Sequence, residues 1–190
     1  DMISQQYIIE DKIYIGGGYN YGMELMLRKN RGRLTGWIGY ALGWAYRHTA
    51  QINDGKPYPA KQDRRHDLSI VANYRINRRW DCSAVFVYAT GNALTMPESM
   101  YLVGENAVCE YGPHNGGRMP AYHRLDLSAN YWISKKKNTE QVINISLYNA
   151  YNRNNPAYLA VDIIQDKDKN GKKDQLIIRK RGKSIYGIIP

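Results

Sequence analysis

The stretch RLTGWIGYALGWAYRHT, residues 33–49, places a large apolar residue at every second position from Leu34 to Tyr46, interrupted only at Gly36. The residues between them are mostly Gly, Ala and Thr. Strict alternation predicts a β-strand with two different faces. Soluble strands usually run about 5–6 residues, whereas a transmembrane β-strand needs about 9–11 residues with an apolar side toward lipid. The length and the row of rings therefore predict a membrane-crossing strand.

The composition fits a membrane domain built from strands. The chain has 190 residues, of which 43% are hydrophobic, and no run approaches the roughly 18 apolar residues of a spanning helix. It contains 17 Tyr and 4 Trp but a single Phe, and such amphipathic rings are enriched at membrane interfaces. A soluble β-protein with a tyrosine-rich binding surface would show the same bias, so composition alone leaves both classes open.

The net charge of +10 first suggests a nucleic-acid partner. The basic residues, however, gather at three short connections between alternating segments: Arg28, Lys29, Arg31 and Arg33; Arg75, Arg78 and Arg79; and Lys135, Lys136 and Lys137. At one end of a barrel these turns would form a basic rim whose long side chains reach lipid phosphates. Solvated turns that prevent aggregation are the alternative. We expect no nucleic-acid partner.

Strand candidates alternate short turns with long polar loops. The strands are expected at residues 19–30, 33–49, 63–77, 80–95, 121–134 and 139–152, and the loops at 50–62, 96–120 and 153–184. Short periplasmic turns and long extracellular loops are typical of outer-membrane barrels. The predicted fold is therefore all-β, an antiparallel transmembrane β-barrel without helices. A soluble sandwich gives the same alternation, and strand length and the rings favour the membrane.

The facing of each strand follows from the alternation. One face is expected to carry Tyr40, Leu42, Leu68, Ile70, Leu125 and Leu127, and the other Asp67, Ser69, Asn73, Arg124, Asp126 and Ser128. Apolar residues alternating with charged ones predict a lipid face and a polar lumen. Trp44, Tyr46 and Tyr88 are expected at the extracellular interface, and Tyr74, Trp80 and Tyr131 at the periplasmic one.

Several segments resemble a known family in colinear order between residue 21 and about residue 160. They are YGMELMLRKNRGRLTGWIGYALGWAYR (21–47), DRRHDLSIVANYRINRRW (63–80), VYATGNALTMP (87–97), GGRMPAYHRLDLSANY (116–131) and SLYNAYNRNNPAY (146–158). They resemble the C-terminal barrel of TonB-dependent outer-membrane receptors, in particular the Bacteroidota type with a carboxypeptidase-like regulatory domain.

This resemblance implies a 22-stranded outer-membrane barrel that imports a scarce ligand, such as a siderophore, glycan, peptide or cofactor, with energy delivered through TonB. Residues 1–190 would form about six spanning strands with their loops, strands 16–21 of the barrel, without the plug or the closing strand. The implied partners are lipid, lipopolysaccharide, TonB through a missing N-terminal region, and a surface lipoprotein. An adhesin or structural barrel without TonB coupling, and a soluble basic β-domain that binds glycan or nucleic acid, remain alternatives.

The segment DRRHD (63–67) is the first candidate site. Arg64, Arg65 and His66 could contact an anionic ligand or lipopolysaccharide phosphates, because guanidinium groups pair with phosphate through two parallel hydrogen bonds. The alternative, which we favour, is a polar network of Asp63, Asp67, Arg124 and Asp126 across the lumen wall. The four histidines show no metal-ligand spacing.

The segment DKDKNGKKD (166–174) is the second candidate site. Asp166, Asp168, Asn170 and Asp174 occupy positions 1, 3, 5 and 9 of a calcium loop, with Gly171 at position 6. Ile177 stands where an EF-hand needs a bidentate Glu, and lysines weaken cation binding. We therefore favour a hairpin tip with a type I′ turn between residues 157–164 and 175–181, and expect no resident cofactor.

Three further expectations follow. No nucleophile, acid/base pair or phosphate loop is evident, so we expect no enzyme activity. Cys82 and Cys109 should not pair, because about a dozen residues at ~3.3 Å each separate their levels. Both termini are expected on the extracellular side, opposite Arg31 and Arg78, and the six strands should form an open arc, because they are too few to close a wide barrel.

Overall fold

The computed structural model describes residues 13–103, 106–136, 139–167 and 173–184. Its elements are strands, with one 3₁₀ turn at Asn53–Gly55 and no α-helix among these residues. The fold is therefore all-β, and every paired strand runs antiparallel to its neighbour. In the described part of the chain, no helical segment has the length and apolar character that a membrane span requires.

Six long strands form the main sheet, in the order β1-β2-β4-β5-β10-β11. They are β1 (Gly16–Lys29), β2 (Leu34–Thr49), β4 (His66–Arg75), β5 (Trp80–Ala89), β10 (Tyr122–Lys136) and β11 (Thr139–Leu147). Each strand pairs with the nearest long strands in sequence, because tight turns and loops both return the chain to the adjacent position. The sheet is open, with β1 and β11 at its edges.

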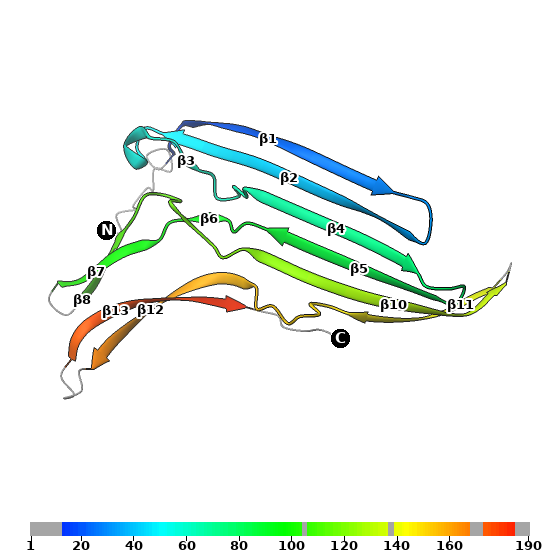
Figure 1. Cartoon of the computed structure of the whole chain (residues 1–190). Coiled ribbons are helices and arrows are strands. Elements are labelled where there is room, and N and C mark those ends of the chain that lie inside the picture. Colours follow the sequence, from blue (N-terminus) through cyan, green and yellow to red (C-terminus); the bar gives the residue numbers. More distant parts are fainter. Residues whose placement is uncertain (1–12, 104–105, 137–138, 168–172, 185–190) are drawn as a thin grey trace, which may run out of the picture.

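The remaining strands are shorter or separate. β3 (Tyr58–Pro59) pairs with the end of β2, and β6 (Ala93–Leu94) pairs with β9 (Gly117–Arg118). β7 (Pro97–Val103) and β8 (Asn106–Tyr111) form one hairpin, and β12 (Pro156–Lys167) and β13 (Lys173–Ser184) form another. Figure 1 shows the tight turns at one end of the main sheet and the longer connections and both hairpins toward the other. We call these the turn end and the loop end.

The strand register assigns the two faces of the sheet. Ile38 lies opposite Ile70, Ile70 opposite Phe86, and Leu127 opposite Ala84. Directly paired residues share a face, so the predicted grouping of Tyr40, Leu42, Ile70 and Leu127 is confirmed. We call their side the apolar face. The polar face carries the alternate residues, among them Asp67, Ser69, Asn73, Asp81, Arg124 and Asp126.

No second layer of described residues packs on either face of the main sheet (Figure 1). Buried side chains lie instead toward the loop end: Thr49, Tyr58, Ala60, Asp63, Ala89, Ala93, Asn115 and Asn149. On the apolar face, by contrast, many large side chains are exposed, from 37% for Leu147 to 67% for Ile145, and others such as Ile70 and Phe86 are half-buried. The buried core of the described residues therefore lies where the long connections meet the main sheet.

The strand predictions are confirmed with shifted ends. β4 begins at His66 rather than at residue 63, β5 ends at Ala89 rather than at 95, and β11 ends at Leu147 rather than at 152. The loops predicted at 50–62 and 96–120 contain short strands of their own, because their backbone groups pair with each other and with β2.

Three other expectations can be compared with the structure. Cys82 and Cys109 are free thiols, as predicted. A hairpin in the last loop is confirmed by β12 and β13, which are longer than expected. The expected positions of the termini concern residues 1–12 and 185–190, which lie outside the described residues.

Candidate functional site

Asp63 anchors the loop end, just before β4. Its side chain is 1% exposed, and its Oδ1 accepts a hydrogen bond from the backbone N–H of Ala45 at 2.7 Å. Its Oδ2 pairs closely with the Arg118 guanidinium of β9 and lies 3.6 Å from Nη2 of Arg65. Arg118 Nη1 also donates to the backbone oxygens of Asp63 and Gly91, at 2.8 and 3.3 Å. One buried carboxylate thus joins β2, β4 and both loops.

The pKa of the Asp63 carboxyl reflects two opposing effects. Burial raises this pKa, because it disfavours the charged form. The hydrogen bonds from Arg118 and Ala45 and the charges of Arg118 and Arg65 outweigh burial and hold the pKa below its ordinary value of 3.8. Asp63 is therefore a stable anion at neutral pH.

A second joint connects the same two loops. Asn115 is buried, its backbone N–H donates to Thr95 Oγ1 at 3.0 Å, and its Nδ2 donates to the Pro59 oxygen at 2.9 Å. Asn53 accepts from the His114 N–H at 2.8 Å and donates to the His114 oxygen at 3.3 Å. Residues 50–65, 90–103 and 106–118 therefore form one connected unit, the loop-end unit.

Asparagines also fix the chain after β11. Asn149 adopts a left-handed backbone with φ 54°, and its side chain exchanges two 3.0 Å hydrogen bonds with the backbone of Arg153. Asn155 does the same for His123 of β10, accepting at 3.0 Å and donating at 2.8 Å. These amides replace strand pairing where β11 has ended.

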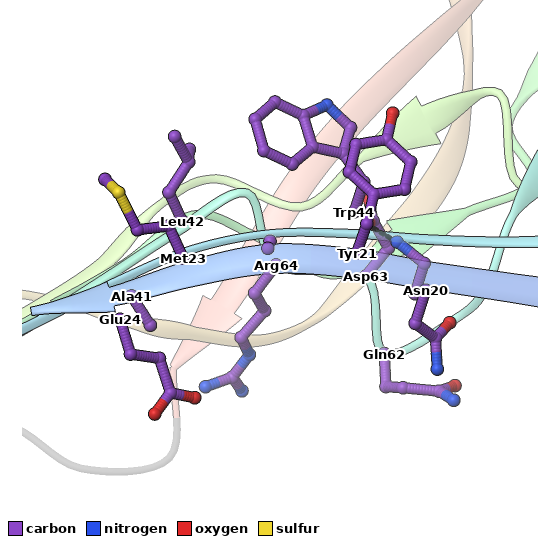
Figure 2. A pocket seen from close by; sticks show the side chains of 13 residues that line it. Asn20, Tyr21, Met23, Glu24, Ala41, Leu42, Trp44, Gln62, Asp63 and Arg64 are labelled. Atoms are coloured by element: carbon purple, nitrogen blue, oxygen red, sulfur yellow. Dashed lines mark hydrogen bonds between the residues drawn. The ribbon is translucent and has the colours of Figure 1, made fainter.

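A groove of about 540 Å³ lies across β1 and β2, beside the start of β4. Figure 2 shows Asn20, Glu24, Gln62 and Arg64 extending to one side of the ribbon, while Tyr21, Met23, Leu42 and Trp44 extend to the other. On the polar side Gly22 faces Gly43 across the two strands, so no side chain covers the backbone there. The floor of the groove is therefore the backbone at Gly22 and Gly43. Its walls carry the Glu24 carboxylate, the amides of Asn20 and Gln62 and the Arg64 guanidinium (Figure 2).

The polar face continues as a hydrogen-bonded ladder. Asn130 donates to Asp81 at 2.8 Å, Asn144 donates to Asn130 at 2.6 Å, and Ser146 donates to Asn144 at 2.6 Å. Toward the loop end Arg124 pairs with Asp126 at 2.9 Å and lies 4.1 Å above the Tyr148 ring. This face satisfies its polar groups laterally, strand to strand.

Rings gather at both ends of the apolar face. At the turn end Trp80 and Tyr131 lie 4.9 Å apart. At the loop end Tyr46, Tyr19, Tyr21 and Trp44 form a continuous stack with successive centroids 5.4, 6.3 and 5.1 Å apart. The guanidinium of Arg65 lies 4.7 Å from the Trp44 centroid and extends this row. The apolar face thus has a ring belt at each end.

The structure separates the residues of the DRRHD segment. Arg64 lies on the polar side, where Nε donates to Asn92 at 2.9 Å, while Arg65 lies over Trp44. His66 pairs with the Tyr40 hydroxyl at 2.8 Å, on the apolar face. The network expected among Asp63, Asp67, Arg124 and Asp126 divides into two clusters, one at Asp63 and one at Arg124–Asp126, and among the described residues Asp67 pairs with neither.

The calcium hypothesis concerns residues whose positions are largely not described. Residues 168–172 and the side chains of Asp166 and Asp174 lie outside the described part of the chain, while Asp166 and Lys167 end β12. The hairpin alternative agrees with the pairing of β12 and β13, and calcium binding stays a prediction. No cluster of three or more metal-binding side chains occurs among the described residues.

Sequence reasoning missed Arg118, Asn115 and Asn149 as organising residues. A single Arg or Asn within a polar loop carries no periodic signal, and partners up to 56 residues away are not readable from spacing. No family model matches the chain, and comparisons with curated proteins and with solved structures gave no match. The function therefore has to be argued from the sheet and its loop end.

Proposed function

We propose that this chain is part of the barrel of a TonB-dependent outer-membrane receptor, which imports a scarce ligand across the outer membrane. The observation that carries the proposal is the single-layer sheet, whose apolar face is covered by no second layer of described residues (Figure 1). Soluble domains bury such a face against a second layer. A lipid bilayer is the environment that covers it without one.

The energy of exposing this face to water supports the proposal. The exposed large residues of this face include Tyr19, Tyr21, Met23, Leu25, Leu27, Leu34, Ile38, Tyr74, Trp80, Leu127, Ile143, Ile145 and Leu147. Burying one such side chain fully stabilises by about 1.5–3 kcal/mol. Since these side chains are about half exposed, the face as a whole forgoes roughly 10–20 kcal/mol, which is comparable to the roughly 5–15 kcal/mol by which a domain is stable. β4 and β5, each 10 residues long, have the length of a bilayer-spanning strand, about 9–11 residues.

The other face supports a water-filled or protein-filled interior. The Asp81–Asn130–Asn144–Ser146 ladder and the Arg124–Asp126 pair satisfy polar groups within the sheet, as the inner wall of a wide barrel requires. The open edges at β1 and β11 point the same way. Unpaired backbone groups in lipid cost several kcal/mol each, so both edges need further strands of the same barrel.

The loop end supports ligand access from outside the cell. Long connections at one end and tight basic turns at the other match extracellular loops and periplasmic turns. The loop-end unit and the groove beneath it lie where an incoming ligand would first meet the wall. With the family resemblance of residues 21–160, we assign energy coupling to TonB, contact with outer-membrane lipid and lipopolysaccharide, and a surface lipoprotein as a further partner.

Fractionation of cells that express the native full-length protein tests the proposal. An antibody against residues 50–62 should detect it in the carbonate-washed outer membrane. The detergent-solubilised protein should bind the purified periplasmic domain of TonB. Outer-membrane location without TonB binding would replace the proposal with an adhesin or structural barrel, and release into the soluble fraction would replace it with a soluble β-domain.

A further inference from the structure

We propose that Arg65 and His66 bind the phosphate of a membrane-lipid headgroup on the apolar face of the sheet, at its loop end. This inference rests on the proposed function, because it requires lipid against that face. It assigns a specific lipid partner to two neighbouring residues whose side chains the structure separates from Arg64.

The orientation of Arg65 is the first step. Its guanidinium lies 4.7 Å from the Trp44 ring centroid, and Trp44 shares the apolar face with Tyr21. The side chain therefore lies along the ring belt rather than over the groove, where Arg64 points (Figure 2). Its Nε is buried and has no hydrogen-bond partner among the described residues, so an anion from outside the chain contacts the exposed part of the side chain and not Nε.

The charge of Arg65 is the second step. The carboxylate nearest to it is Asp63, 3.6 Å away, but Asp63 also pairs more closely with Arg118 and accepts the Ala45 N–H. Two guanidinium groups thus share one carboxylate, which leaves about one positive charge in the cluster. The Arg65 side chain is 28% exposed, so an anion can reach it.

Two histidines on the same face lie in a row with Arg65 and add hydrogen-bond donors to it. His66 Nδ1 pairs with the Tyr40 hydroxyl at 2.8 Å, and His123 Nδ1 pairs with the Tyr151 hydroxyl at 2.7 Å. When the hydroxyl donates to Nδ1, Nε2 carries the proton and is a donor. Tyr88 lies between them on the same face, opposite His123 and diagonal to His66. The row crosses β4, β5 and β10 at one height.

The position of the row selects a lipid phosphate. It lies at the loop-end border of the apolar face, beside the Tyr and Trp stack that suits headgroup depth. At this depth the phosphate is the anion that phospholipids and lipid A share, and arginine pairs with phosphate through two parallel charge-assisted hydrogen bonds. A planar guanidinium held against Trp44 is already oriented for such pairing.

Native mass spectrometry of the full-length protein in detergent tests the inference. The probes are lipid A with both phosphates, the same lipid after enzymatic removal of the phosphates, and inorganic phosphate alone. The variants are Arg65→Gln, Arg65→Lys, and Arg64→Gln as a matched control, because the neighbouring Arg64 side chain lies on the polar side of the sheet (Figure 2). Phosphorylated lipid A should bind the wild type about tenfold more tightly than the dephosphorylated lipid, and Arg65→Gln should remove that preference.

The controls separate the sources of binding. Arg64→Gln should keep the preference, and Arg65→Lys should retain part of it, because the charge remains without the planar fork. Equal binding of the two lipids by the wild type, an unchanged preference in Arg65→Gln, or equally tight binding of inorganic phosphate would each overturn the inference. The comparison of the two lipids uses the wild type alone, so it still tests the inference if the Arg65→Gln protein misfolds. If the protein is found in the outer membrane but shows no preference for the phosphorylated lipid, this inference alone is refuted. If the protein is found in the soluble fraction, the proposed function is refuted.

Discussion

Replacing Asp63 by Asn should loosen both long loops at once. The carboxylate is buried, and its two oxygens bind Ala45 of β2 and Arg118 of β9. Asparagine keeps the shape and can still accept the Ala45 N–H through its oxygen. Its amide group, however, then faces Arg118 donor to donor, and the ion pairs with Arg118 and Arg65 are lost.

The size of the effect follows from burial. Removing one partner of a buried ion pair costs about 3–5 kcal/mol, and Arg118 is 33% exposed and recovers part of that by hydration. We therefore expect Asp63→Asn to lower the free energy of opening the loop-end unit by about 2–3 kcal/mol. This corresponds to a roughly 30- to 150-fold larger open population.

Hydrogen exchange measured by mass spectrometry on the full-length protein reports that population. The peptide covering residues 58–64 contains the N–H groups of Ala60 and Asp63, which donate to the oxygens of Ala45 and Ala60 at 2.9 and 2.8 Å. The peptide covering residues 90–95 contains the N–H group of Thr90, which donates to the His66 oxygen at 2.9 Å. Both peptides should exchange faster in Asp63→Asn. Asp54→Asn is the matched control, because Asp54 is exposed in the same connection and its φ of 56° suits Asn. Equal exchange in the two variants would refute the shared anchor.

The effect of Asp63→Asn on the free energy of opening should depend on pH. Since the folded pKa of Asp63 lies below 3.8, its contribution is complete above about pH 4 and is lost as the pH falls through the folded pKa. The difference in opening free energy between wild type and Asp63→Asn should therefore be constant near neutrality and shrink below about pH 4. A difference that persists unchanged at pH 2 would contradict the charge-based account.

Three further predictions can be checked on the full-length protein. Gly36→Ala would place a Cβ 2.0 Å from the Val71 oxygen at a φ of +152°, so it should destabilise the sheet by about 2 kcal/mol or more in urea titration, whereas Gly43→Ala, whose nearest atoms lie 4.0 Å away, should be near neutral. Asn149→Ala should cost about 1–3 kcal/mol, seen as faster exchange confined to residues 148–155; protection equal to wild type would contradict its role. Cys82 and Cys109 should both alkylate after unfolding without reductant, and a chain that accepts no label would indicate a disulfide.

The strands could be predicted because their information is local. Alternation at period two is written into each segment, and the register then brings the predicted apolar residues to one face. The strand ends could not, because tertiary contacts set them. β4 starts only at His66, since Asp63 before it is held by Ala45 and Arg118, and β11 stops at Leu147, since Asn149 turns into the left-handed region two residues later.

The candidate site was less predictable for the same reason. Asp63 and Arg118 are 55 residues apart, and neither lies in a periodic segment. In the DRRHD segment, alternation of side chains also predicts the wrong face for Arg65. Strict alternation would keep Arg65 on the polar face, but β4 has not yet begun there, and the side chain lies against Trp44 instead. Face assignment from alternation holds only where both neighbours are paired strand.

The small residues between the large ones of β2 gain a reason from the groove. A strand with one wet face usually alternates apolar with polar residues, yet β2 places Gly39, Ala41, Gly43 and Ala45 on the polar face. Their size leaves the backbone bare beneath Gln62 and Arg64. Those two wall residues directly flank Asp63, so the buried carboxylate that joins the loops also sets the wall over the floor. The small residues of β2 and the wall residues Gln62 and Arg64 come from segments with no shared sequence pattern. Their relative position therefore depends on Asp63, which binds β2 through Ala45.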